Sequence, residues 1–98
     1  MIDGESLLQR LLSSDTKADL LTLFRGNPGL VDGIDGVARR IGRRPMSIKA
    51  EVDDLLDLGV LGKKQAGKTV VLYLQKERDA ELQEAVAAYL STPGLVSL

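Results

Sequence analysis

Two short amphipathic helices joined by a tight turn restrict the fold of this chain more than any other feature. The apolar residues of each helix recur at spacings of three and four, which places them on one helical face. The two apolar faces consist of Ile34, Val37, Ala38 and Ile41, and of Ile48, Val52, Leu55 and Leu56. Gly42 ends the first helix, and Pro45, whose fixed φ suits a first helical turn, begins the second. Helices joined this closely must cross at a steep angle.

The pattern changes after Gly59, where a residue without a Cβ can take the left-handed conformation that closes a helix. From Val60 onward the sequence indicates two β-strands that turn at Ala66-Gly67. Period-two alternation predicts that Val70, Leu72 and Leu74 point to one side of the second strand, and Val71 and Tyr73 to the other. The tip of this hairpin is polar and basic.

Further helices are expected on both sides of this segment. Ser14 or Asp15 caps a helix that ends at the breaker Gly26–Gly29, and leucines at positions 7, 8, 11 and 12 mark an earlier one. We therefore predict a mainly α fold with a small β-hairpin (α+β). A chain of 98 residues with 44% hydrophobic content fits a single domain. Its expected parts are an N-terminal helix (1–13), a core (14–75), a C-terminal helix (76–91) and a tail (92–98).

The segment from Ile34 to Tyr73 resembles the winged helix-turn-helix of transcription regulators of the arsenical-resistance and multiple-antibiotic-resistance repressor types. The matching residues are Val37-Ala38 in the first helix, Ile41-Gly42 at the turn, Ile48, Val52 and Leu55 in the second helix, and Leu58-Gly59-Val60-Leu61 at its exit. With the preceding helix, the resemblance covers roughly two thirds of the chain.

This resemblance implies sequence-specific binding of double-stranded DNA by a small transcription regulator. The recognition helix, residues 45–58, would enter the major groove, and the wing, residues 62–69, would follow the backbone. It also implies a homodimer formed through the terminal helices. The alternative for those helices is that both only cap the core.

The charge distribution supports this hypothesis, although the chain as a whole carries a net charge of only −1. Eight basic and four acidic residues lie between Arg39 and Lys68, a balance of +4, whereas the other residues carry five basic and ten acidic groups, a balance of −5. Positive charge therefore gathers on the turn and the wing, where phosphates would lie. The competing interpretation is a solubilising surface.

Twelve residues are the candidates for DNA contact. They are Arg39, Arg40, Arg43, Arg44, Met46, Ser47, Lys49, Ala50, Lys63, Lys64, Gln65 and Lys68. By resemblance, Arg44, Ser47, Lys49 and Ala50 occupy base-contacting positions, and the last four residues of the list occupy the wing.

Acidic residues late in the recognition helix argue the other way. A rotation of 100° per residue predicts that Met46, Ser47, Ala50, Asp53, Asp54 and Asp57 all face outward. Asp53 and Asp54, expected on a solvated face, would repel phosphates unless only the first two turns of the helix lie deep in the groove. The alternative function is a winged-helix module that binds another protein and no DNA. The exposed aspartates, the short basic wing and the acidic pI of 5.3 favour it.

Catalysis and cofactor binding find little support. Residues 62–69 match the phosphate-cradling string G-x-x-x-x-G-K-[ST], but that loop needs a strand before it and a helix after it, and the order here is reversed. We expect no nucleotide there. Without Cys or His, no zinc site, disulfide or Ser-His or Cys-His catalysis is possible, so no enzyme activity, metal or cofactor is expected.

The sequence also bears on the location of the protein. Its first five residues are acidic where a secretory signal would be basic, and no apolar run approaches the length that spans a bilayer. We predict a cytoplasmic protein without a membrane partner.

Overall fold

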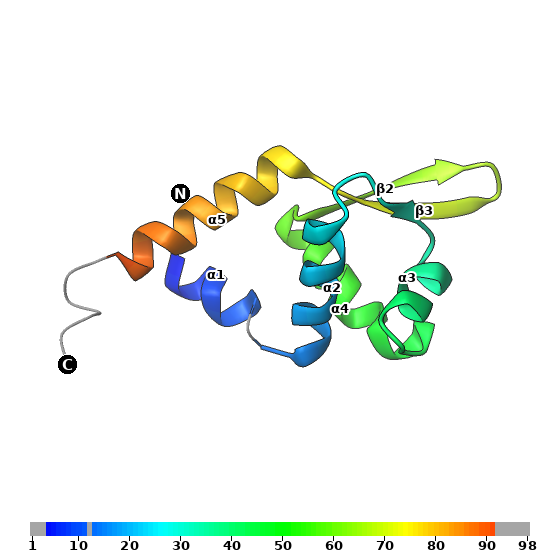
Figure 1. Cartoon of the computed structure of the whole chain (residues 1–98), viewed down its shortest axis with the longest axis horizontal. Helices are drawn as coiled ribbons and strands as arrows, with labels where there is room; N and C mark the ends of the chain where they lie inside the picture. The colour runs from blue at the N-terminus through cyan, green and yellow to red at the C-terminus, as the bar shows by residue number, and fades with distance from the viewer. Residues whose placement is uncertain (1–3, 12, 92–98) are drawn as a thin grey trace.

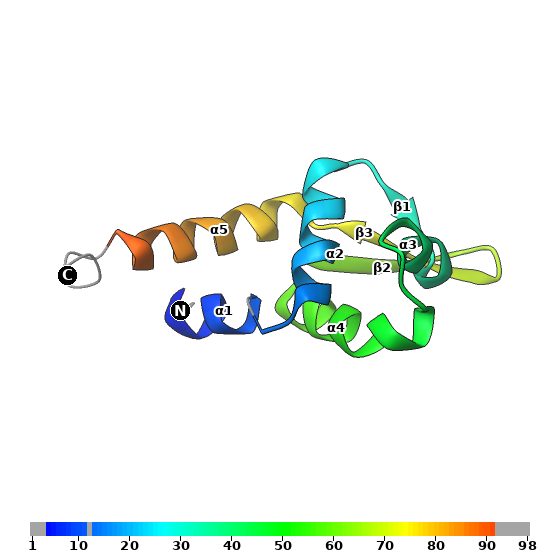
Figure 2. The ribbon, with the colours of Figure 1, turned by 60° about the horizontal axis from the view of Figure 1, so that its bottom comes forward.

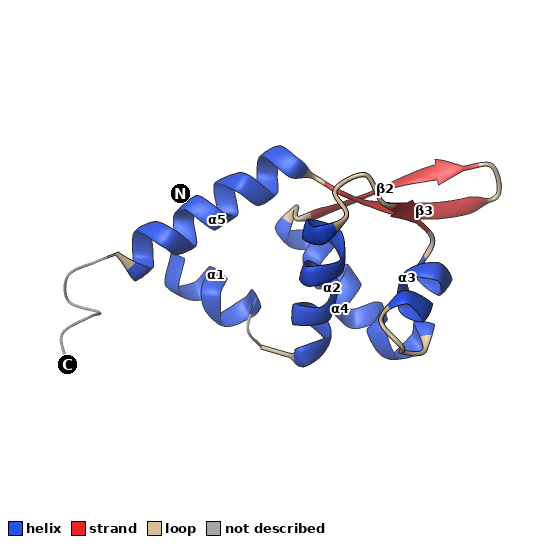
Figure 3. Ribbon diagram, viewed as in Figure 1, coloured by secondary structure: helices blue, strands red, loops and turns tan. Residues whose placement is uncertain are grey.

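The computed structural model describes residues 4–11 and 13–91 (Figure 1). Its elements, in chain order, are α1 (Gly4–Leu11), α2 (Asp15–Gly26), β1 (Val31–Asp32), α3 (Ile34–Arg40), α4 (Pro45–Leu58), β2 (Leu61–Ala66), β3 (Thr69–Leu74) and α5 (Lys76–Leu90). Figure 3 shows one small sheet lying along one side of a group of helices, so the predicted mainly α, α+β fold class is confirmed. The expected tail 92–98, and residues 1–3 and 12 of the expected first helix, lie outside the described residues.

The α3–turn–α4 unit forms as its apolar spacing predicts. Gly42 adopts a positive φ of 68°, and the Arg43 amide donates to the Ala38 carbonyl at 2.9 Å, so the chain reverses within a few residues. Pro45 occupies the first turn of α4, and Gly59 ends the helix with a φ of 84°. The two glycines therefore bound the turn–helix segment, which carries six of the twelve candidate DNA contacts.

The sheet has one strand more than the predicted hairpin. β2 and β3 pair antiparallel from Leu61 opposite Leu74 to Ala66 opposite Thr69. β1 adds two residues to the other edge of β3, with Val31 opposite Tyr73, so the strand order is β1-β3-β2. A strand of two residues is too short for alternation to reveal it.

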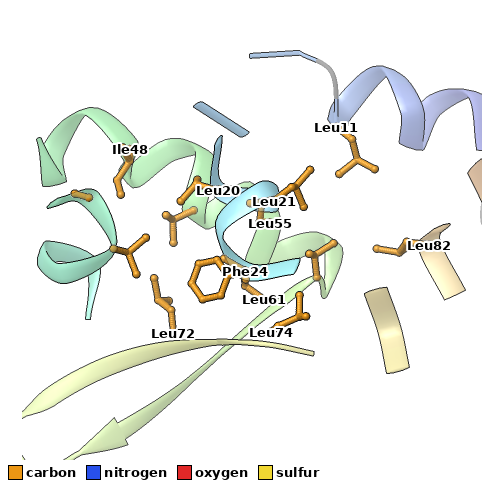
Figure 4. Close-up of a cluster of buried hydrophobic side chains, with 14 of the residues drawn as sticks. Leu11, Leu20, Leu21, Phe24, Ile48, Leu55, Leu61, Leu72, Leu74 and Leu82 are labelled. Atoms are coloured by element: carbon orange, nitrogen blue, oxygen red, sulfur yellow. The ribbon is translucent and has the colours of Figure 1, made fainter. Parts of the chain in front are cut away.

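Side chains from α2, α4 and the sheet meet in a single core (Figure 4). Phe24 is fully buried between Leu55 of α4 and the sheet residues Leu72 and Leu74. Val70, predicted to share one side of β3 with Leu72 and Leu74, is 48% exposed because it lies beyond the core near the hairpin tip.

A pair of helices, α1 and α5, projects from this core, and we call it the arm. α1 packs along α5, and the described molecule is elongated, with principal extents of 50 × 24 × 20 Å. Figure 2 shows the arm at one end and the hairpin tip at the other. The buried Asp79 of α5 accepts hydrogen bonds from Arg25 of α2, at 2.8 to 3.2 Å, and from Gln83 of its own helix. The contact with Arg25 holds the arm against the core.

Within residues 4–11 and 13–91, no helix has both the length and the apolar character that a membrane span requires. The same residues contain no group of three or more acidic side chains close enough together to hold a metal ion.

Candidate nucleic-acid interface

The first two turns of α4 present an open surface. Met46 is 91% exposed, and Ser47, Lys49 and Ala50 are exposed as well, while Ile48 between them is completely buried. The helix thus lays one stripe on the core and leaves the opposite stripe free, which is the arrangement that the apolar spacing predicts. This half of α4 lies toward the same end of the molecule as α3 and the hairpin (Figure 2).

A cleft of about 750 Å³ separates α3 from the turn end of the hairpin. It brings Lys68 together with Arg39 and Arg40, which precede it by almost thirty residues in the sequence. The acidic residues Asp32 and Asp35 also line it. The fold therefore joins cations of α3 and the wing into one surface that sequence order alone does not connect.

Two arginines of this surface are held by acidic residues of neighbouring elements. Arg43 donates two hydrogen bonds, at 2.8 and 3.2 Å, to one carboxylate oxygen of Asp19 on α2. Arg40 Nε lies 3.3 Å from a carboxylate oxygen of Asp32 on β1. Both arginines are partly exposed, so a phosphate would compete with an existing ion pair at either position.

Two lysines also have intramolecular partners. Lys49 Nζ lies 3.3 Å from a carboxylate oxygen of Asp53 one turn along α4. Lys64 Nζ lies 5.6 Å from the centre of the Tyr73 ring, within the range of a cation–π contact. Lys63 and Lys64 are consecutive strand residues, so their side chains leave opposite faces of the hairpin. The phosphate backbone of one DNA strand therefore cannot contact Lys63 and Lys64 from the same face of the hairpin.

Four of the eight cations have no such partner. Within residues 4–11 and 13–91, no ion pair engages the side chains of Arg39, Arg44, Lys63 and Lys68, and all four residues are exposed. They come from α3, the α3–α4 turn, β2 and the hairpin turn, respectively. These are the side chains most free to meet phosphates.

The remaining polar candidates are partly committed to local hydrogen bonds. Ser47 Oγ donates to the Arg44 carbonyl at 2.7 Å, which uses its proton and leaves the oxygen as an acceptor. Gln65 Nε2 donates to the Gly67 carbonyl at 3.1 Å across the hairpin turn.

The prediction that Asp54 points into solvent was wrong. Its carboxylate turns toward the α1–α2 corner, where it accepts hydrogen bonds from Lys17 Nζ and Arg10 Nη2. The hydrogen bond from Lys17 is the main cause that lowers the pKa of Asp54 below its ordinary value of 3.8, and Arg10 adds to the effect. The Asp54 hydrogen bond likewise raises the pKa of Arg10. Position 54 differs from 53 because α1 and α2 cover it, which helical rotation alone does not show.

Every aspartate of α4 therefore has a cationic partner. Asp53 pairs with Lys49, Asp54 with Lys17 and Arg10, and Asp57 with Arg10 at 3.3 Å. The repulsion of phosphates that the sequence suggested is correspondingly reduced.

Sequence reasoning also missed Lys17. Its residue is only 7% exposed, and it lies on the stripe that Leu20, Leu21 and Phe24 form at spacings of three, four and seven along α2. A lysine at an apolar position of an amphipathic helix was the available signal, because a buried cation requires a partner.

The string at residues 62–69 lies in the β2–turn–β3 hairpin, with Gly67 at a φ of 63° in the turn. An antiparallel strand, Thr69–Leu74, follows the string where a phosphate-cradling loop would enter a helix.

Together, the α3–α4 pair and the β2–β3 hairpin define a winged helix-turn-helix domain. No protein-family model and no curated protein matches the sequence. Three solved structures share its fold, as the resemblance in the sequence implied.

The first structure is described as a possible transcriptional regulator for arsenical resistance, with a TM-score of 0.70 and 14% identity, covering 97% of this chain and 91% of the other. The second is the AntR antimony-specific transcriptional repressor, with a TM-score of 0.61 and 19% identity over 87% and 75% of the two chains. The third is a possible transcriptional regulator from Methanosarcina mazei Go1, with a TM-score of 0.65 and 15% identity over 92% and 82%. At these identities the likeness extends to the fold.

Proposed function

We propose that this protein is a small transcription regulator that binds double-stranded DNA, with the first two turns of α4 in a major groove and the β2–β3 hairpin on the backbone. One observation carries the proposal: four unpaired cations flank an exposed helix face whose acidic neighbours are already neutralised within the protein. The fold shared with a transcriptional repressor and with two proteins described as possible transcriptional regulators supports it.

The exposed residues of α4 suit the edges of base pairs. Met46 and Ala50 offer apolar contact to a thymine methyl group, and the Ser47 oxygen accepts a hydrogen bond from an exocyclic amine. Arg44 has the planar donor pair that guanine accepts. With its side chains an α-helix is about 10–12 Å across, which fits a major groove about 12 Å wide.

We also propose that the active form is a homodimer joined through the arm. A largely apolar groove of about 770 Å³ runs between α1, α2 and α5, where Leu8, Leu11, Leu21, Val86 and Leu90 line it. Leu90 is 51% exposed. A second copy of the same helices offers a matching apolar surface, and a two-fold dimer would present two α4 helices to successive turns of DNA.

The primary test is fluorescence anisotropy of a labelled mixed-sequence duplex titrated at several salt concentrations. If the four unpaired cations each neutralise one phosphate, the log–log slope of affinity against salt should be about −3.6 per protomer. A protein that binds only other proteins should leave the anisotropy unchanged at low salt.

Charge-reversal variants distinguish a specific contribution of the hairpin lysines to DNA binding from the effect of the overall charge of the protein. Lys63, Lys64 and Lys68 changed together to Glu should weaken binding to every duplex sequence, whereas Ser47→Ala should alter the preference among sequences. Lys68→Glu and Lys76→Glu form a matched pair, because each reverses the charge of one exposed lysine, the first in the hairpin turn and the second at the start of α5, beyond the other end of β3. Equal losses from the two single changes would argue against a specific role of the hairpin.

The dimer is tested by measuring the mass in solution of Leu90→Lys and of Val31→Lys. Both residues are apolar and about half exposed, but only Leu90 lines the groove of the arm. We expect Leu90→Lys to shift the mass toward the monomer and Val31→Lys to leave it unchanged. A wild-type monomer at the concentrations used for DNA binding would contradict the dimer without contradicting DNA binding.

A further inference from the structure

A buried lysine connects the arm, the core and the C-terminal half of α4. Lys17 Nζ donates to the Arg10 carbonyl at 3.0 Å, to Ser13 Oγ at 2.9 Å and to Asp54 Oδ2. These three hydrogen bonds use all three ammonium protons. Because the residue is 7% exposed, solvent does little to replace any of them, and the acceptors fix where the ammonium group lies.

Asp54 is the point where two cations from different elements meet. Its Oδ2 accepts from Lys17 of α2, and its Oδ1 accepts from Arg10 of α1. Arg10 Nη2 also lies 3.3 Å from Asp57, one turn further along α4. The last turns of α4 are thereby held by directional, charge-assisted hydrogen bonds from α1 and α2.

These hydrogen bonds restrict rotation of α4 about its own axis, which apolar packing resists only weakly. Ile48, Val52 and Leu55 hold one side of α4 against the core, but dispersion contacts have little directional preference. The Asp54 bonds act about 125° around the helix from that stripe and therefore oppose rotation of α4 about its own axis. Asp54 lies about 12 Å along the helix from Met46, so a rotation at one end changes the orientation of the exposed face at the other.

Arg10 extends the connection to the arm. It lies near the end of α1, whose Leu7 and Leu11 are buried and which packs along α5. Arg10 thus links the orientation of α4 to the position of the helices that line the apolar groove.

We propose that Lys17 and Asp54 are positioning residues for DNA recognition: they fix the orientation of α4 relative to the arm and contact no DNA themselves. The inference rests on the proposed DNA binding. The inference predicts that removing the negative charge of Asp54 weakens DNA binding and that removing the charge of Asp53 does not. Electrostatic repulsion of phosphates alone would predict no such difference.

The matched variants are Asp54→Asn and Asp53→Asn, which remove the same charge from adjacent residues with little change in shape. The probe is a duplex recovered from a random pool by the wild-type chain. We expect Asp54→Asn to raise Kd about tenfold, comparable to losing one well-placed base contact. Asp53→Asn should leave Kd within about twofold of the wild type or lower it, since Asp53 is exposed and weakly paired.

A double variant tests whether the two residues act as a unit. Lys17→Met keeps the aliphatic stem and removes the buried cation. If Lys17 and Asp54 position α4 together, Lys17→Met with Asp54→Asn should raise Kd less than the product of the two single effects. Additive effects would overturn the assignment to a shared role.

A readout without DNA measures the orientation itself. The chain has no cysteine, so Ala50→Cys and Glu84→Cys place one spin label on the exposed face of α4 and one on exposed α5. With unlabelled chains in excess, the distance distribution within one protomer should broaden or shift in Asp54→Asn and remain unchanged in Asp53→Asn.

The outcomes distinguish the two proposals. If the wild-type chain binds no duplex, the proposed function fails, and an unaltered label distance in Asp54→Asn would overturn the positioning role independently. If the wild type binds and both asparagine variants bind equally well, the positioning inference fails while DNA binding stands. Circular dichroism confirms that each variant is folded at the temperature of the measurement.

Discussion

The two halves of α4 belong to one regular helix, yet they meet different surroundings. The first half is open on its outer side, with Met46 almost fully exposed and Lys49 paired only within the helix. The second half is held from outside the helix, by Lys17 and Arg10. The comparison teaches that the repulsion an acidic residue of α4 would exert on a phosphate depends on which cation already neutralises that residue within the protein.

The largest expected contrast between the halves is in stability. Leu55→Ala in the buried stripe should lower the free energy of unfolding by about 2 to 5 kcal/mol, since it leaves a cavity in the core. Met46→Ala should change it by less than about 0.5 kcal/mol. Urea unfolding followed by circular dichroism measures both, and similar losses would contradict the described burial of α4.

The next effect concerns the ion cluster. Asp54→Asn should lower the free energy of unfolding by about 1 to 3 kcal/mol, because it leaves Lys17 buried without its counterion. Asp53→Asn, in an exposed pair, should stay within about 0.5 kcal/mol of the wild type. Equal values for the two variants would show that Asp54 is no better anchored than its neighbour.

Lowering the pH should reduce the stability difference between the wild type and Asp54→Asn. The pKa of Asp54 is lowered in the folded protein, mainly by the Lys17 hydrogen bond, so its contribution is complete above the ordinary value of 3.8 and is lost as the pH falls through the lower folded value. The difference in unfolding free energy between wild type and Asp54→Asn should therefore be constant from pH 7 to about pH 5 and shrink below pH 3.8. Urea titrations at several pH values measure it. A difference that instead grows on acidification would reverse the assigned sign.

The smallest effects compare the two glycines that bound the turn–helix segment. Gly42→Ala and Gly59→Ala should each cost about 1 kcal/mol, because both residues have a positive φ. Gly59→Ala should cost a few tenths more, since its new Cβ would lie 2.9 Å from Cγ of Arg78, whereas the space beside Gly42 is open. Equal costs would indicate that the Arg78 side chain moves aside freely.

Local signals were sufficient to predict much of this fold. Apolar spacing located α3 and α4, and glycine and proline marked where they begin and end, because these features depend on residues only a few positions apart. The Ser14 cap of α2 was predictable for the same reason, and its Oγ accepts from the Lys17 amide at 3.1 Å.

Features that depend on distant residues were not predictable in this way. β1 exists because Val31 and Asp32 pair with β3, some forty residues later. Asp54 differs from Asp53 because the α1–α2 corner reaches it, and the partners of Arg40 and Arg43 come from β1 and α2. The candidate surface could thus be located from the sequence, while the division of its cations into paired and unpaired groups required the tertiary structure.

The arrangement of the small sheet also protects the protein from aggregation through its sheet edges. Its strand order leaves β1 and β2 as the outer strands, whose free amide and carbonyl groups would otherwise attract another chain. β1 is only two residues long, and β2 carries adjacent lysines at 63 and 64. Both features discourage edge-to-edge pairing between chains, so Lys63 and Lys64 oppose aggregation independently of any role in binding.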